Sequence, residues 1–160
     1  MPLSKGQLTV LDVLIRNIEL LAQLYGLYAM KLPHKYKFWY GAAMEKKGHA
    51  DLLRTTLVVD STTMFFDENR FKLDELQASL ELARKRLSEV ESKALYPFVA
   101  VNNALEIEQK LAERRFFENR DGDGDDVRTV MNLITEQLAG FVGRLKDEYA
   151  ALEQAEDQEP

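Results

Sequence analysis

The sequence predicts an all-helical protein, and three observations support this fold class. Apolar residues recur at steps of three and four over long stretches, which is the spacing of one face of an α-helix. Only 4 prolines and 8 glycines interrupt the 160 residues. Charged residues make up 30% of the chain, a share that suits long amphipathic helices with solvated faces. A chain of this length can bury a core within one domain.

Five segments carry the helical period. The first is expected at residues 6–32 and ends before Pro33, because proline disfavours the helical conformation in the residue that precedes it. The others are expected at about 34–58, 72–92, 97–118 and 126–154. The stretch Asp60–Asn69 has no helical period and is expected to be a loop whose Phe65 and Phe66 pack on the end of the bundle. The acidic stretch Asp121–Asp126 is expected to be a turn that caps the last helix.

Two arrangements accommodate these segments. One is a four-helix bundle of two antiparallel helix pairs with a long crossover, in which 72–92 is an extra helical segment. The other is a simple up-and-down bundle of five helices. Helical periodicity alone does not distinguish them. In either case we expect one domain at 1–155 and an acidic, disordered tail at 156–160.

Charge and cysteine content exclude several functional classes. The net charge of −6 opposes binding to nucleic acid or to an anionic membrane, since both favour basic patches. No apolar run approaches the roughly 20 residues of a membrane helix. The sequence has no cysteine, which excludes disulfides, thiolate metal sites and cysteine nucleophiles. Because Met1–Lys5 shows no signal peptide, we expect a cytoplasmic protein.

Three stretches share a pattern of acidic, aromatic and histidine residues. In 18–25, Glu19 stands about two turns before a tyrosine. In 38–50, an aromatic pair precedes a segment that ends in His49 and an alanine. The third stretch, 104–108, reads Ala-Leu-Glu-Ile-Glu. Together these stretches resemble the ferritin-like superfamily, in particular its rubrerythrin-like branch.

The resemblance implies a four-helix bundle that holds two iron or manganese ions. In that family two helices each supply a Glu-x-x-His pair, and the other two helices supply one glutamate each. Carboxylates and imidazoles together suit iron and manganese. The corresponding metal candidates here are Glu19, His49 and Glu108. Glu108 is preferred to Glu106 because it lies on the apolar stripe of its helix.

The chain departs from the family pattern in two places. Lys46, not glutamate, stands three residues before His49, and the adjacent Glu45 is turned about 100° away around the helix. The two histidines, His34 and His49, both lie in the first half of the chain. The last helix therefore has no Glu-x-x-His, and its weaker candidate is Glu136. The second metal position lacks its histidine.

Two interpretations of the remaining residues stay open. In one, a single iron or manganese ion binds Glu19, His49 and Glu108. In the other, which we favour, the Lys46 ammonium replaces the metal and bridges the carboxylates, because two buried carboxylates repel each other. The remaining glutamates, Glu45, Glu106 and Glu136, are weaker ligand candidates.

These interpretations lead to different functions. The lysine interpretation predicts a non-catalytic, metal-poor ferritin-like protein without a cofactor. The metal interpretation, with one or two iron or manganese ions, predicts an oxidoreductase or an iron-handling protein of the rubrerythrin or ferritin type. A helical adaptor unrelated to ferritins is a third hypothesis, favoured by a plain up-and-down bundle. For the ferritin-like fold we expect a homodimer formed through the long helices.

Overall fold

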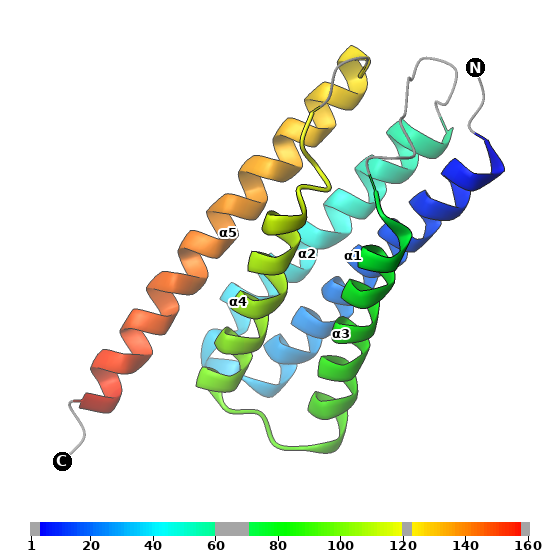
Figure 1. The fold of residues 1–160 in the computed structure, drawn as a ribbon. Helices are drawn as coiled ribbons and strands as arrows, with labels where there is room; N and C mark the ends of the chain where they lie inside the picture. The colour runs from blue at the N-terminus through cyan, green and yellow to red at the C-terminus, as the bar shows by residue number, and fades with distance from the viewer. Residues whose placement is uncertain (1–3, 60–70, 120–122, 158–160) are drawn as a thin grey trace.

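The computed structural model describes residues 4–59, 71–119 and 123–157, and these segments are mainly helical (Figure 1). Five α-helices, and no strand, occur in this part of the chain: α1 (Lys5–Lys31), α2 (Tyr36–Leu53), α3 (Leu73–Ser92), α4 (Pro97–Arg114) and α5 (Asp125–Asp157). The short 3-10 helix η1 (Pro33–Lys35) joins α1 to α2, and the π-helix η2 (Arg54–Val59) continues α2. The all-helical prediction is confirmed.

Local sequence signals set the helix ends. The Ser4 side chain accepts a hydrogen bond from the Gln7 amide, and the Gln7 side chain accepts one from the Ser4 amide, so α1 begins with a capping box. Pro97 occupies the first turn of α4, where its missing N–H costs nothing. At its other end α4 stops at Arg114, four residues before the expected end. Arg115 adopts a left-handed conformation with φ of 55°, which terminates the helix.

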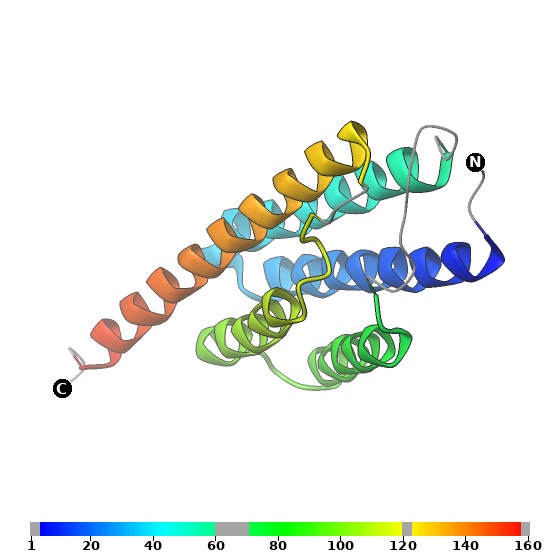
Figure 2. The ribbon, with the colours of Figure 1, turned by 45° about the horizontal axis from the view of Figure 1, so that its top comes forward.

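Consecutive helices run in opposite directions (Figure 1). Helix α1 packs against α2 and α3, while α4 packs against α5 and α3, and α2 also contacts α5. Figure 2 shows α1 between α2 and α3, with α4 beside α3. Because α3 runs back along the molecule, α2 and α4 point the same way. These helix directions fit an up-and-down bundle of five helices. They fit equally well two antiparallel helix pairs, α1 with α2 and α4 with α5, joined by a crossover that contains α3.

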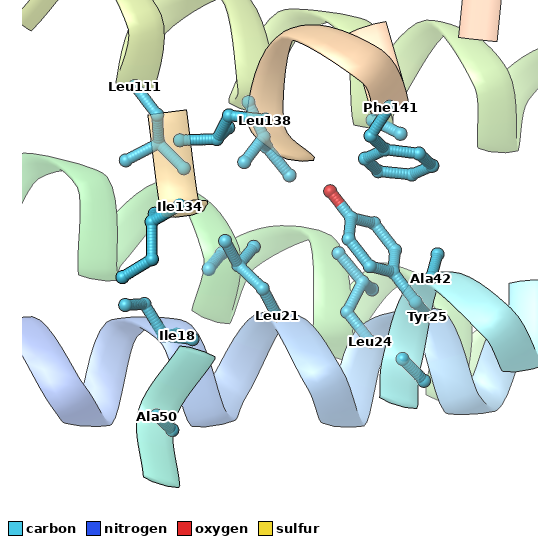
Figure 3. Packing of buried hydrophobic residues seen from close by; sticks show 14 of the residues in the cluster. Ile18, Leu21, Leu24, Tyr25, Ala42, Ala50, Leu111, Ile134, Leu138 and Phe141 are labelled. Carbon is cyan, nitrogen blue, oxygen red and sulfur yellow. The ribbon is translucent and has the colours of Figure 1, made fainter. Parts of the chain in front are cut away.

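The core is built from apolar residues of all five helices. Figure 3 shows Ile18 and Leu21 of α1 facing Ile134 and Leu138 of α5. At one end of this region lies an aromatic cluster, formed by Tyr25, Tyr28, Trp39, Phe38 and Phe141. The two tyrosines and the tryptophan are at most 1% exposed, so their rings belong to the core.

Several expectations fall on residues outside the described ranges. These are the Asp60–Asn69 loop with Phe65 and Phe66, the first two residues of the Asp121–Asp126 turn, and the end of the 156–160 tail. The start of that tail is helical, because α5 continues to Asp157. Among the helices that the structure describes, none combines the length and the apolar character that a membrane-spanning segment needs.

Candidate functional site

Lys46 of α2 and Glu108 of α4 form an ion pair inside the bundle. The Lys46 Nζ atom lies 2.8 Å from Glu108 Oε1 and 2.9 Å from Glu108 Oε2, so one ammonium contacts both carboxylate oxygens. The two side chains are 4% and 0% exposed. Removing each charge from water costs several kcal/mol, which only close pairing and further hydrogen bonds offset. The geometry of this pair meets that requirement.

Tyr25 of α1 is the third member of this group. Its hydroxyl donates a hydrogen bond to Glu108 Oε1 at 2.8 Å, and its side chain is fully buried. Burial and then the negative charge of Glu108 raise the pKa of Tyr25 well above its ordinary value. The phenol is therefore a neutral donor. Three helices, α1, α2 and α4, meet at one carboxylate.

His49 lies one turn after Lys46 on the same face of α2. Its Nε2 atom is 2.5 Å from Gln137 Oε1 of α5, so a proton on Nε2 is donated to the amide oxygen. Burial and then the positive charge of Lys46 lower the pKa of His49 to about 4. His49 is therefore neutral at neutral pH. This contact links α2 to α5 as the ion pair links α2 to α4.

Glu19 lies outside the core, so the prediction that it points inward is wrong. Its side chain is 51% exposed, and Glu19 Oε1 accepts a hydrogen bond from Arg54 Nη2 at 2.6 Å. The core positions of α1 in this region belong to Ile18 and Leu21 (Figure 3). One residue along a helix turns the side chain by about 100°, which directs Glu19 away from the core. The structure therefore does not bring Glu19 together with Lys46 or with the other metal candidates.

The weaker candidates lie apart from the buried pair. Glu45 Oε2 is 3.3 Å from Arg144 Nη2. Glu106 contacts Arg86 at 2.7 Å, and the hydrogen bond from Arg86 is the main cause that lowers the pKa of Glu106. Glu136 is exposed. The preference for Glu108 over Glu106 as the core residue is confirmed, since Glu108 is fully buried and Glu106 is 38% exposed.

Sequence reasoning missed Gln137, the residue of α5 that meets His49. The candidate that the sequence suggests in this helix, Glu136, is one residue earlier. The sequence carries a signal for this position, because Ile134 and Leu138 lie on one apolar stripe of α5 and both are buried. Residue 137 lies three positions after Ile134 and next to Leu138, so it shares the edge of that face.

The residues of the site do not fit a ferritin-type pair of metal ions. The Glu108 carboxylate is paired with Lys46 and hydrogen-bonded by Tyr25, and His49 is hydrogen-bonded to Gln137. An ammonium at this position repels a metal cation. In the part of the chain that the structure describes, no group of three or more histidine, aspartate or glutamate side chains is placed to hold a metal.

Comparisons with protein-family models, with curated proteins and with solved structures give no match. The basis for a functional proposal is therefore the geometry of the buried pair and the residue pattern around it.

Proposed function

We propose that the chain is a non-catalytic four-helix bundle of the ferritin-like type, in which the Lys46 ammonium takes the place of a core metal. In this proposal α1, α2, α4 and α5 are the four bundle helices, and α3 belongs to the crossover. One observation carries it: a single ammonium contacts both oxygens of a fully buried carboxylate that comes from another helix. A metal-binding bundle likewise holds its cation against buried carboxylates from its helices, and this likeness supports the proposal.

The inward positions of the other helices support this proposal. The two Glu-x-x-His pairs of the family correspond to Lys46 with His49 on α2, and to Ile134 with Gln137 on α5. The carboxylate of the third ligand-bearing helix corresponds to Glu108. Each substituted position satisfies its surroundings without a metal. Lys46 neutralises Glu108, Gln137 hydrogen-bonds to His49, and Ile134 is fully buried in the apolar core.

A core of this kind stabilises one arrangement of helices and leaves function to the surface. The homodimer that we expect would use the outer face of the α1–α2 hairpin. Tyr36, Tyr40 and Met44 recur at four-residue steps on one exposed face of α2, where the two tyrosine rings are stacked at 5.3 Å, and Met30 of α1 is exposed as well. Exposed apolar side chains that gather on one face are typical of an interaction surface.

Metal analysis of the untagged protein tests the proposal. The protein is expressed in medium supplemented with iron and manganese, and its metal content is measured, followed by anaerobic titration with Fe(II) and with Mn(II) in a calorimeter. We expect substoichiometric metal and no saturable heat. One or two tightly bound ions per chain, with an oxo-bridged absorption band after exposure to oxygen, would instead support an iron-dependent oxidoreductase or iron-handling protein.

A further inference from the structure

The C-terminal part of α5 carries an apolar stripe that the described chain covers only in part. Phe141 and Leu145 are buried, but the next members of the stripe, Tyr149 and Leu152, are only half-buried. Figure 1 shows that the last turns of α5 extend past the beginning of α4. The stripe therefore continues beyond the helices that bury it.

A groove of about 410 Å³ lies between this end of α5 and the start of α4. It is lined by Tyr96, Pro97, Phe98, Leu152, Ala155 and Glu156. The Phe98 ring packs edge-on against Tyr149 with centroids 4.8 Å apart, which ties α4 to this end of α5. Tyr96 is 66% exposed, although it is a large aromatic residue. The volume accommodates one or two large apolar side chains of another molecule.

On its α5 side the groove is lined by the exposed Glu156, in a segment of the helix that is rich in carboxylates. Residues 146–157 contain five carboxylates and a single lysine. Glu148 is paired with Lys35 at 3.1 Å, whereas Glu153 and Glu156 are exposed to solvent. Negative charge at a helix C-terminus opposes the helix dipole, which favours cations there. The carboxylates at the C-terminal end of α5 are therefore locally unfavourable in the free protein, and a positively charged partner relieves this.

We propose that this groove is the docking site of a basic amphipathic helix of another protein. The partner would seat large apolar side chains between Tyr96 and Leu152, and would place lysine or arginine residues beside Glu153 and Glu156. A second copy of this chain is a poorer occupant, because groove-to-groove contact would bring two acidic helix ends together in a protein whose net charge is already −6. The proposal does not depend on the state of the buried ion pair.

Fluorescence anisotropy with a labelled synthetic helix of leucine and lysine, leucine on one face, tests this site. A peptide of the same composition in scrambled, non-amphipathic order is the probe control. We expect the amphipathic probe to bind about tenfold more tightly than the scrambled one, and its affinity to fall with added salt. Equal binding of the two peptides would overturn the proposal, because it would show attraction by charge alone.

Variants locate the probe on the chain. Leu152→Ser removes the apolar floor, and Tyr96→Ser removes an exposed wall without touching the core, so it remains informative if Leu152→Ser fails to fold. Each is expected to weaken the amphipathic probe about tenfold. The matched control Leu133→Ser replaces an exposed leucine elsewhere on α5 and is expected to leave the affinity unchanged. If Tyr96→Ser binds the amphipathic probe as tightly as the wild type does, the proposal is overturned. It is also overturned if light scattering shows a homodimer that Tyr96→Ser dissociates, because the occupant of the groove is then a second copy.

Discussion

Two ion pairs of similar length lie in opposite surroundings in this protein. Lys46 and Glu108 meet inside the bundle with side chains 4% and 0% exposed, whereas Arg54 and Glu19 meet on the surface with side chains 46% and 51% exposed. The surface pair is even shorter, at 2.6 Å against 2.8 Å. Exposed pairs contribute about 0–1 kcal/mol, but breaking a buried pair costs about 3–5 kcal/mol. Burial, not distance, decides which pair the fold depends on.

The largest expected effect comes from breaking the buried pair. Lys46→Met leaves the Glu108 carboxylate buried without its cation, and we expect the free energy of unfolding to fall by about 3–5 kcal/mol. Glu19→Gln at the surface pair is the matched comparison, with an expected change of at most about 1 kcal/mol. Urea denaturation followed by circular dichroism measures both. Equal losses in the two variants would show that the buried pair has no special role.

The second effect concerns pH, because His49 is neutral in the folded state. The pKa of His49 is lowered to about 4 in the fold, against about 6.5 in the unfolded chain, so between these values the unfolded state binds more protons. The contribution of His49 to the free energy of unfolding is therefore complete above pH 6.5. As the pH falls from 6.5 towards 4, the free energy of unfolding decreases by up to about 3 kcal/mol for this reason.

Comparison of unfolding free energies at several pH values isolates this contribution. Between pH 6.5 and 4, we expect the free energy of unfolding of His49→Gln to change less steeply with pH than that of the wild type, because this histidine is absent. The pH dependence that comes from carboxylates remains. His34→Gln removes the other histidine, which is exposed, and is expected to keep the wild-type slope. A wild-type slope in His49→Gln would contradict the lowered pKa.

The smallest of these effects comes from the hydroxyl of Tyr25. Tyr25→Phe removes a hydrogen bond to an ionised carboxylate, and we expect a loss of about 1.5–3 kcal/mol in the free energy of unfolding. Tyr28→Phe is the matched control, because the Tyr28 hydroxyl accepts a hydrogen bond from the neutral Asn103 amide at 3.2 Å, a contact worth about 1 kcal/mol. If the two variants lose the same stability, the Tyr25 contact with Glu108 contributes no more than an ordinary hydrogen bond.

The sequence predicts the helices well and the contacts between them less well. Helical period reports which residues of one helix share a face, and it correctly places Glu108 inward, where Ala104 and Leu111 of the same helix are also buried. It is weakest at the edge of a stripe. Glu19 resembles a ligand position of the ferritin-like pattern, yet its side chain is exposed and its neighbour Ile18 points into the core. The contact between His49 and Gln137 depends on how two helices that are distant in the sequence face each other. The apolar period of one helix carries no information about that.

The end of α4 illustrates the same limit at short range. The apolar period of α4 continues to about residue 118, but the helix stops at Arg114 because Arg115 is left-handed, with φ of 55°. Glycine is the usual residue in that conformation, so an arginine gives no local signal for the end of a helix. The surrounding packing, in which Phe116 and Phe117 are buried, favours this conformation.

The proposed replacement of a metal by Lys46 is tested most directly by introducing the glutamate that the ferritin-like pattern has at this position. Lys46→Glu places a Glu-x-x-His pair beside Glu108, and Lys47→Glu makes the same charge change on the exposed side of α2. Both variants and the wild-type protein are titrated with Mn(II) without oxygen, and their melting temperatures are measured with and without the metal. We predict that Lys46→Glu alone binds about one ion per chain and is stabilised by it. Stoichiometric binding by the wild type, or none by Lys46→Glu, would contradict the account.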